Sequence, residues 1–145
     1  MTLAAALTAL AGEGVRLLGR SGWYRSEPLP ASNQPWFVNA VARVATALDP
    51  FALLDLMQAV ELRFGRVRSV ANAARTIDLD LLDYDGRRFR TPRLVLPHPR
   101  LAERRFVLRP LAELAPHWRH PISGLPAAAL ERALPAGQPV VRMAD

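Results

Sequence analysis

Two aspartates separated by one residue, Asp78 and Asp80, are the part of the sequence best suited to chemistry. They lie between Arg75 and Tyr84, where apolar and polar residues alternate, and this period of two predicts a β-strand. The two carboxylates would share one face of that strand, and the pKa of one would rise unless a cation lay nearby. A hard divalent cation suits such oxygen ligands. Taken alone, however, the pair is better explained as the acidic outer face of a half-exposed edge strand.

The residues around this strand are basic, and they favour a metal site over a solvated acidic face. Arg66 and Arg68 precede the strand, Arg75 opens it, and His98 and Arg104 follow. Proteins hold Mg²⁺ with one or two carboxylates and leave phosphate oxygens to complete its coordination. Arginine binds phosphate through two parallel hydrogen bonds. Together these residue types indicate a site for a magnesium-bound polyphosphate.

Five blocks of the sequence, taken in order, resemble the 6-hydroxymethyl-7,8-dihydropterin pyrophosphokinase family of folate synthesis. The blocks are Trp23–Ser26, Gln34–Ala40, Glu61–Arg68, Ala73–Leu82, and Leu96–His98 with Arg104–Phe106. They follow one another at near-family spacing and cover nearly the whole chain. Five ordered blocks are a specific signal, whereas a lone Asp-x-Asp is a weak one.

The resemblance implies an ATP-dependent diphosphotransferase that moves the β,γ-pyrophosphoryl group of ATP to the hydroxymethyl group of a dihydropterin and releases AMP. It implies that Asp78 and Asp80 hold two Mg²⁺ ions and that ATP is the co-substrate. The catalytic arginines would be Arg66, Arg75 and Arg104.

The resemblance also assigns the binding residues. The ATP side would contain Gln58, Glu61, Arg68 and His98, and the pterin side would contain Ser26, Leu29, Phe37, Asn39 and Phe106. The two phenylalanines would sandwich the flat ring, and the asparagine would bind its edge, since an amide offers a donor and an acceptor together. Without the resemblance, Gln58 and Glu61 would be expected on a solvated helix face.

Composition is that of one globular domain over residues 1–145, with 50% hydrophobic and 22% charged residues. The absence of cysteine excludes a disulfide framework, a thiolate zinc site and a cysteine nucleophile. No apolar run approaches the length of a membrane span, and we expect a cytoplasmic protein. The net charge of +6 indicates an anionic ligand and leaves nucleotide, RNA and acidic surfaces open.

Local signals predict an ordered series of helices and strands. They are a helix over Met1–Ala11, strands over Val15–Tyr24 and Trp36–Ala47, a helix over Asp49–Phe64, the strand over Arg75–Tyr84, an extended piece over Arg93–Leu96, and helices over Arg104–Leu114 and Leu125–Leu134. Asp49 is the expected N-cap with Pro50 at the first helical position. Pro110 is expected to break or begin the helix that contains it.

This order predicts an α+β fold of the ferredoxin-like type (βαββαβ), with an antiparallel sheet and helices on both faces. The first strand of that pattern is missing from the predicted series. We therefore expect the chain as written to be a start-site truncation that is poorly soluble, oligomeric or inactive. A version extended by roughly 15–25 residues, one strand plus a loop, would be monomeric and active. Solubility, thermal unfolding and AMP formation of the two versions compare them directly.

Two other functions are compatible with parts of the sequence. A basic ferredoxin-like module could bind nucleic acid by stacking bases on exposed aromatic residues of its sheet, but the central strand here carries acids. An inactive relative or fragment could serve as an interaction module, but the predicted metal ligands are intact. We expect small-molecule substrates, ATP and hydroxymethyldihydropterin, with neither nucleic acid nor membrane as a partner.

Overall fold

The computed structural model describes residues 2–27, 35–65 and 77–144. Its elements are α1 (Thr2–Ala11), β1 (Val15–Arg20), β2 (Tyr24–Ser26), β3 (Phe37–Asn39), β4 (Ala42–Thr46), α2 (Pro50–Arg63), β5 (Phe89–Arg90), β6 (Val95–Leu96), η1 (Leu101–Glu103), α3 (Arg105–Leu114), α4 (Ala127–Arg132) and β7 (Val140–Arg142). All strand pairs among them are antiparallel. The predicted α+β class is confirmed.

The two predicted long strands, Val15–Tyr24 and Trp36–Ala47, pair as a hairpin, but each arm bends and divides into two shorter strands. β1 pairs with β4, and β2 pairs with β3. Ser21 joins the arms across the bend, because its backbone N–H donates to Val41 O at 2.9 Å and its Oγ accepts from Val41 N at 3.0 Å. The serine hydroxyl thus takes the place of a carbonyl in the ladder, and the two halves remain one paired hairpin.

Helix α2 begins and packs as the sequence predicts. Asp49 is its N-cap, with Oδ1 accepting from Ala52 N at 2.9 Å, and Pro50 follows at the first helical position. Leu53, Met57 and Val60 are buried in the core. The helix therefore presents its apolar stripe to α1 and β1, and it directs Glu61 inward beside that stripe.

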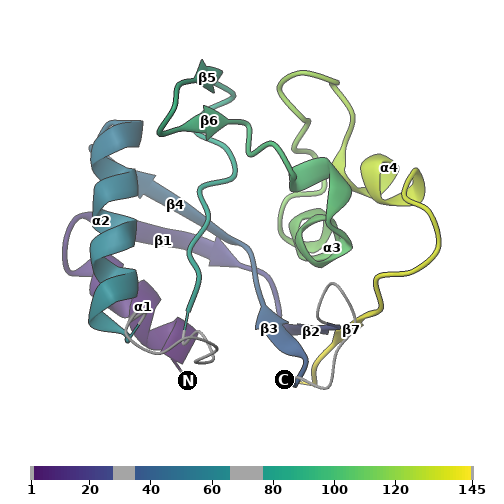
Figure 1. The fold of residues 1–145 in the computed structure, drawn as a ribbon, viewed down its shortest axis with the longest axis horizontal. Helices are drawn as coiled ribbons and strands as arrows, with labels where there is room; N and C mark the ends of the chain where they lie inside the picture. The colour runs from purple at the N-terminus through teal and green to yellow at the C-terminus, as the bar shows by residue number, and fades with distance from the viewer. Residues whose placement is uncertain (1, 28–34, 66–76, 145) are drawn as a thin grey trace.

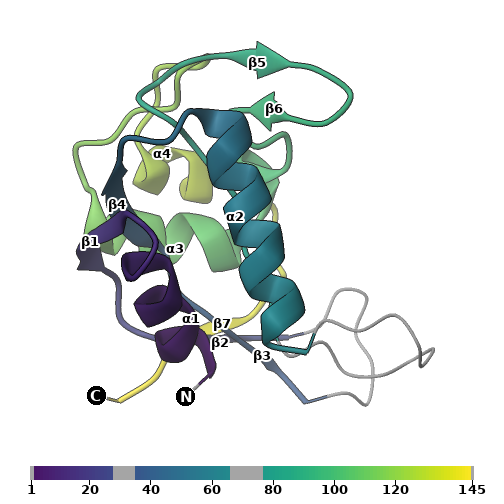
Figure 2. The ribbon, with the colours of Figure 1, turned by 90° about the vertical axis from the view of Figure 1, so that its left-hand side faces the viewer.

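Two hydrophobic clusters form the core. The first joins α1, β1 and α2, and the second joins α3, α4 and η1 with Val41 at the hairpin bend. Figure 1 shows α1, α2, β1 and β4 on one side of the molecule and α3 and α4 on the other. The side view in Figure 2 places α1 and α2 nearest the viewer and α3 and α4 behind them.

The chain passes between these clusters along residues 77–83, which lie in no strand. The prediction of a strand over Arg75–Tyr84 is therefore wrong for these residues. A strand requires a neighbouring ladder, and here backbone groups bond elsewhere: Leu79 N donates to Glu61 Oε2 at 2.6 Å, and Leu82 O accepts from His98 N at 2.9 Å. Figure 1 shows this segment rising from the lower edge towards β5 and β6.

The predicted alternation of faces along this segment is nevertheless confirmed. Ile77 is buried in the first cluster, and Leu79 and Leu81 pack against it. Asp78 and Asp80 are exposed on the other side. The sequence pattern thus identified the faces correctly, although the segment has no strand partner.

Helix α3 corrects a second expectation, because it continues through Pro110. Proline removes a helical hydrogen bond and crowds the preceding turn. Here Pro110 and Leu108 are fully buried, and Leu111 is nearly so. Packing of this apolar face outweighs the local cost of the proline.

The C-terminal part of the chain returns to the hairpin, where β7 pairs with the outer side of β2. The order of this small sheet is β3–β2–β7. Among the helices of the described ranges, none is both long enough and apolar enough to span a membrane.

Candidate functional site

The acidic segment is fixed by Glu61, a residue that points into the protein rather than to solvent. Glu61 is 4% exposed, and its Oε2 accepts a hydrogen bond of 2.6 Å from Leu79 N. Leu79 lies between Asp78 and Asp80. A carboxylate acceptor makes a strong hydrogen bond in such surroundings. Glu61 therefore sets the position of both predicted metal ligands through the backbone that joins them.

Arg104 lies where the acidic segment meets the start of α3. Its Nη1 is 3.7 Å from Asp80 Oδ2, and its guanidinium carbon is 5.5 Å from the centre of the Phe106 ring. The Arg104 side chain is 25% exposed. The structure thus brings together a predicted metal ligand, a predicted catalytic arginine and a predicted pterin-binding aromatic residue.

His98 belongs to the same group, and its hydrogen bonding fixes which nitrogen carries the proton. Burial lowers the pKa of His98 below its ordinary value, Arg104 and Arg100 lower it further, and Asp80 opposes them. Its Nδ1 accepts from Arg100 N at 3.1 Å. The shift favours the neutral ring. Because Nδ1 is the acceptor, its proton lies on Nε2, so His98 offers an anion one N–H donor.

The β2–β3 hairpin carries the other predicted substrate-binding residues. Ser26 is buried, and its Oγ accepts from Asn39 Nδ2 at 2.6 Å. Phe37 pairs with Ser26 across the ladder and is 51% exposed. The serine orients the amide, and the amide keeps its Oδ1 and a second N–H for another partner.

A further acid, Glu113, joins α3 to this hairpin and was not identified from the sequence. Glu113 accepts from Gly22 N at 2.8 Å, from Tyr24 Oη at 2.5 Å and from Arg142 Nε at 3.0 Å. Hydrogen bonds from Arg142 and then from Tyr24 are the main causes that lower the pKa of Glu113 to about 2. Because these partners are remote in sequence, no local pattern predicts this role.

The donor set of Asp78 and Asp80 fits a hard divalent cation. Both residues supply only oxygen, both are exposed, and they share one side of the segment. Within the described ranges no three His, Cys, Asp or Glu side chains are grouped as a complete metal site. A pair of carboxylates suits Mg²⁺, which keeps several waters and takes phosphate oxygens from its substrate.

Four of the predicted site residues lie outside the described residues: Leu29, Arg66, Arg68 and Arg75. Of the two residues predicted for the ATP side on α2, Gln58 is exposed and Glu61 is buried. The expectation that both share a solvated face is therefore wrong for Glu61, because its carboxylate reaches the backbone of the acidic segment.

Comparison with known proteins identifies related chains. The profile of the 7,8-dihydro-6-hydroxymethylpterin-pyrophosphokinase (HPPK) family matches residues 1–116. The chain is 48% identical over 106 residues to 2-amino-4-hydroxy-6-hydroxymethyldihydropteridine pyrophosphokinase of Pseudomonas aeruginosa, and 45% identical over 103 residues to the protein of that name from Methylorubrum extorquens. It is 40% identical over 116 residues to folic acid synthesis protein fol1 of Pneumocystis carinii.

The alignments cover more of this chain than of its relatives. They include 73%, 71% and 80% of this chain for the Pseudomonas, Methylorubrum and Pneumocystis proteins respectively. The chain spans 65% of the length of each bacterial relative and 16% of the Pneumocystis protein. Residues 117–145, which include α4 and β7, lie beyond the family match.

The bond between Glu61 and Leu79 N generates a stability prediction. Glu61→Ala removes the acceptor from a part-buried N–H, and we expect the free energy of unfolding to fall by about 1–3 kcal/mol. Glu61→Gln keeps an oxygen acceptor and should lose less. Urea unfolding at pH 7 measures both, with exposed Gln58→Ala on the same helix as the control. An Ala variant as stable as the wild type would contradict the role assigned to Glu61.

Proposed function

Because this chain belongs to the 7,8-dihydro-6-hydroxymethylpterin-pyrophosphokinase (HPPK) family, we propose that it transfers pyrophosphate from ATP to 6-hydroxymethyl-7,8-dihydropterin in folate biosynthesis. The hydroxymethyl oxygen attacks the β-phosphorus of ATP and gives up its proton to solvent. The bond from that phosphorus to the α-phosphate oxygen breaks, and AMP leaves with that oxygen. The observation that carries the proposal is the acidic segment: two exposed carboxylates, held through Leu79 N by Glu61, beside Arg104.

Asp78 and Asp80 hold two Mg²⁺ ions in this proposal. When bound there, the metal would supply charge neutralisation of the triphosphate and orientation of its oxygens. Arg104 exchanges its contact with Asp80 for a phosphate oxygen, which is feasible because the 3.7 Å ion pair is long and partly exposed. Arg66 and Arg75 stabilise the charge that develops during transfer.

His98 takes part as a hydrogen-bond donor rather than as a cation. Burial lowers its pKa, which favours the neutral ring, and because Nδ1 accepts from Arg100 N, the donor of that ring is Nε2–H. A neutral donor binds a phosphate oxygen without adding repulsion against Arg104. Arg68 and Gln58 complete the ATP side. Glu61 contributes to the ATP side indirectly, because its carboxylate holds the backbone between Asp78 and Asp80.

The pterin lies against the β2–β3 hairpin and the start of α3 in this proposal. Phe37 and Phe106 stack on its two faces, and the Asn39 amide binds its edge with the groups that Ser26 leaves available. Leu29 lines the same pocket. The full-length protein acts as a monomer on its two small-molecule substrates.

One assay tests the proposed function. The chain is incubated with ATP, Mg²⁺ and hydroxymethyldihydropterin, and AMP is measured. Formation of AMP that requires the pterin supports the proposal. Salt-dependent binding of RNA without binding of ATP would instead favour a basic nucleic-acid-binding module.

Removal of one charge from the acidic pair should abolish turnover and leave the fold intact. Asp78→Asn and Asp80→Asn each weaken the metal site, and we expect a loss of on the order of a thousandfold or more in rate. AMP formation at saturating Mg²⁺ measures the loss. Asp85→Asn is the matched control, since Asp85 is an exposed turn residue at φ 53 and asparagine tolerates that conformation. Near-normal rates in either site variant would discard the metal assignment.

Loss of either stacking ring should weaken pterin binding more than ATP binding. Stacking contributes roughly 0.5–1.5 kcal/mol beyond burial, so Phe37→Ala and Phe106→Ala should each raise the pterin Kd severalfold. Calorimetric titration with each ligand separates the effects. Phe89→Ala serves as a control on the β5–β6 hairpin, where Phe89 packs edge-on against Phe51. Variants that lost ATP affinity and kept pterin affinity would place these rings on the nucleotide side.

A further inference from the structure

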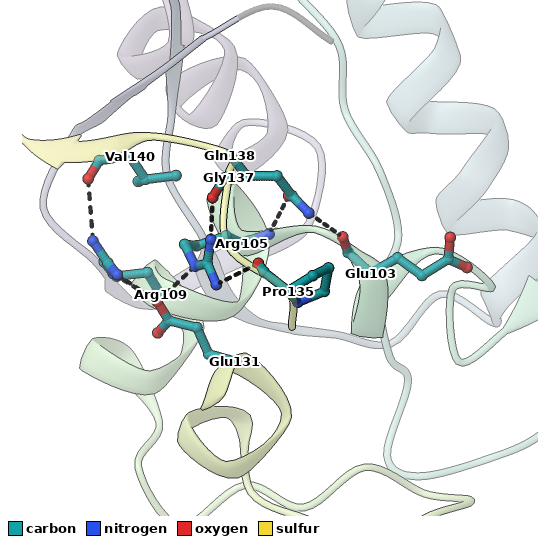
Figure 3. Close-up of polar contacts among 8 residues, drawn as sticks. All are labelled: Glu103, Arg105, Arg109, Glu131, Pro135, Gly137, Gln138 and Val140. Atoms are coloured by element: carbon teal, nitrogen blue, oxygen red, sulfur yellow. Dashed lines mark hydrogen bonds and ion pairs between the residues drawn. The ribbon is translucent and has the colours of Figure 1, made fainter. Parts of the chain in front are cut away.

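The C-terminal segment Pro135–Arg142, here called the strap, connects the two elements that carry the proposed pterin site. It lies beyond residues 1–116 of the family match, and the proposed reaction uses none of its residues. One end of the strap contacts the start of α3, and the other forms β7 beside β2. Figure 3 shows the polar contacts at the α3 end.

At α3 the strap supplies the capping hydrogen bond that the N-cap residue of the helix does not make. Arg104 is the N-cap residue of α3, and its side chain makes no capping hydrogen bond. Arg105 N, one of the donors a helix leaves unpaired at its start, donates instead to Gln138 Oε1 at 2.9 Å. Gln138 Nε2 donates in turn to Glu103 O at 3.0 Å. Gln138 therefore fixes the turn that carries Arg104 and Phe106.

Two arginines of α3 fasten the same segment. The Arg105 guanidinium donates to Pro135 O at 3.4 Å and to Gly137 O, and Arg109 donates to Val140 O at 3.1 Å. Both arginines also pair with Glu131, at 3.3 Å from Arg105 Nε and 2.6 Å from Arg109 Nη2. The two guanidinium groups therefore hold the strap against α3.

At the other end the strap completes the sheet beside the hairpin. Ser26 pairs with Val140 and Tyr24 with Arg142, while Glu27 N donates to Pro139 O at 3.3 Å. Arg142 approaches Gly22 so closely that a Cβ there would lie 2.5 Å from its Nη2. The strap therefore holds β2 on the side opposite Asn39.

We propose that the strap is a positioning element of the pterin site, which keeps Phe106 on α3 at a set distance from Ser26 and Asn39 on the hairpin. The inference rests on the proposed function, because it assigns the pterin to these residues. Gln138 is the positioning residue that the sequence beyond the family match contributes, and it acts through the turn containing Arg105 rather than by touching substrate.

Gln138→Gly tests the inference with little backbone disturbance. Gln138 has φ 55, a conformation that glycine adopts freely, so the change removes the amide and its two hydrogen bonds. Ala136→Gly, at an exposed strap residue, is the matched control for added flexibility. Gln138→Glu retains the acceptor for Arg105 N and loses the donor to Glu103 O, so its effect should be intermediate.

Amide hydrogen exchange and ligand titration give two separate readouts. In Gln138→Gly we expect exchange at the first turn of α3 and along β2 to accelerate by about tenfold or more, because two hydrogen bonds are lost. The Kd for hydroxymethyldihydropterin should rise by about the same order. The Kd for Mg²⁺–ATP should rise less, because Arg104 is the one proposed phosphate-binding residue on this turn. Neither the exchange rates nor the two Kd values should change in Ala136→Gly.

The outcomes separate the strap from the proposed function. Unchanged exchange in Gln138→Gly overturns the inference, as does faster exchange with an unaltered pterin Kd. Equal loss of pterin and ATP affinity also overturns it, since the defect would then be general. Failure of the proposed function would be visible without any strap variant, because the wild type and Ala136→Gly would both fail to bind the pterin.

Discussion

A buried carboxylate holds the part of the chain that lies in no strand, and the proposed site depends on it. Glu61 is 4% exposed, and its Oε2 lies 2.6 Å from Leu79 N. An unpaired buried charge and an unpaired backbone N–H are each costly, so each group satisfies the other. Since Leu79 lies between Asp78 and Asp80, the bond that secures the core also directs two carboxylates to solvent. Structural stability and site geometry therefore depend on the same contact.

The charge of the site is compatible with an anionic ligand that brings its own cations. Arg104 lies 3.7 Å from Asp80, and burial lowers the pKa of His98. Asp78 is engaged as well. Both carboxylates thus have interaction partners within the protein. The proposed Mg²⁺ ions would therefore serve mainly to neutralise the charge of the triphosphate. If Arg104 moved from Asp80 to a phosphate oxygen, the Asp80 carboxylate would become available to a cation, and the fold would stay unchanged.

Sequence reasoning succeeded where the cause of structure is local. The start of α2 follows from Asp49 and Pro50, which act within one helical turn. Alternation along residues 77–82 predicts the correct faces but not the absence of a ladder, because strand pairing depends on remote partners. Glu61 and Gln138 bond to residues 18 and 33 positions away. An isolated helix gives no sign that one of its glutamates is buried, so these contacts could not be predicted from the sequence.

Helix α3 shows why contacts beyond the family match can reach the site. Pro110 removes one hydrogen bond from its ten residues, so the helix gains little stability from its own backbone. Its position is therefore set by the packing of its apolar face and by the contacts that hold its ends. Glu113 fixes the last turn to β2, and Gln138 caps the first turn, next to Arg104 and Phe106. A short helix held at both ends transmits a displacement at either end to the other, because packed elements shift as units. The strap therefore bears on substrate geometry although it contains none of the predicted site residues.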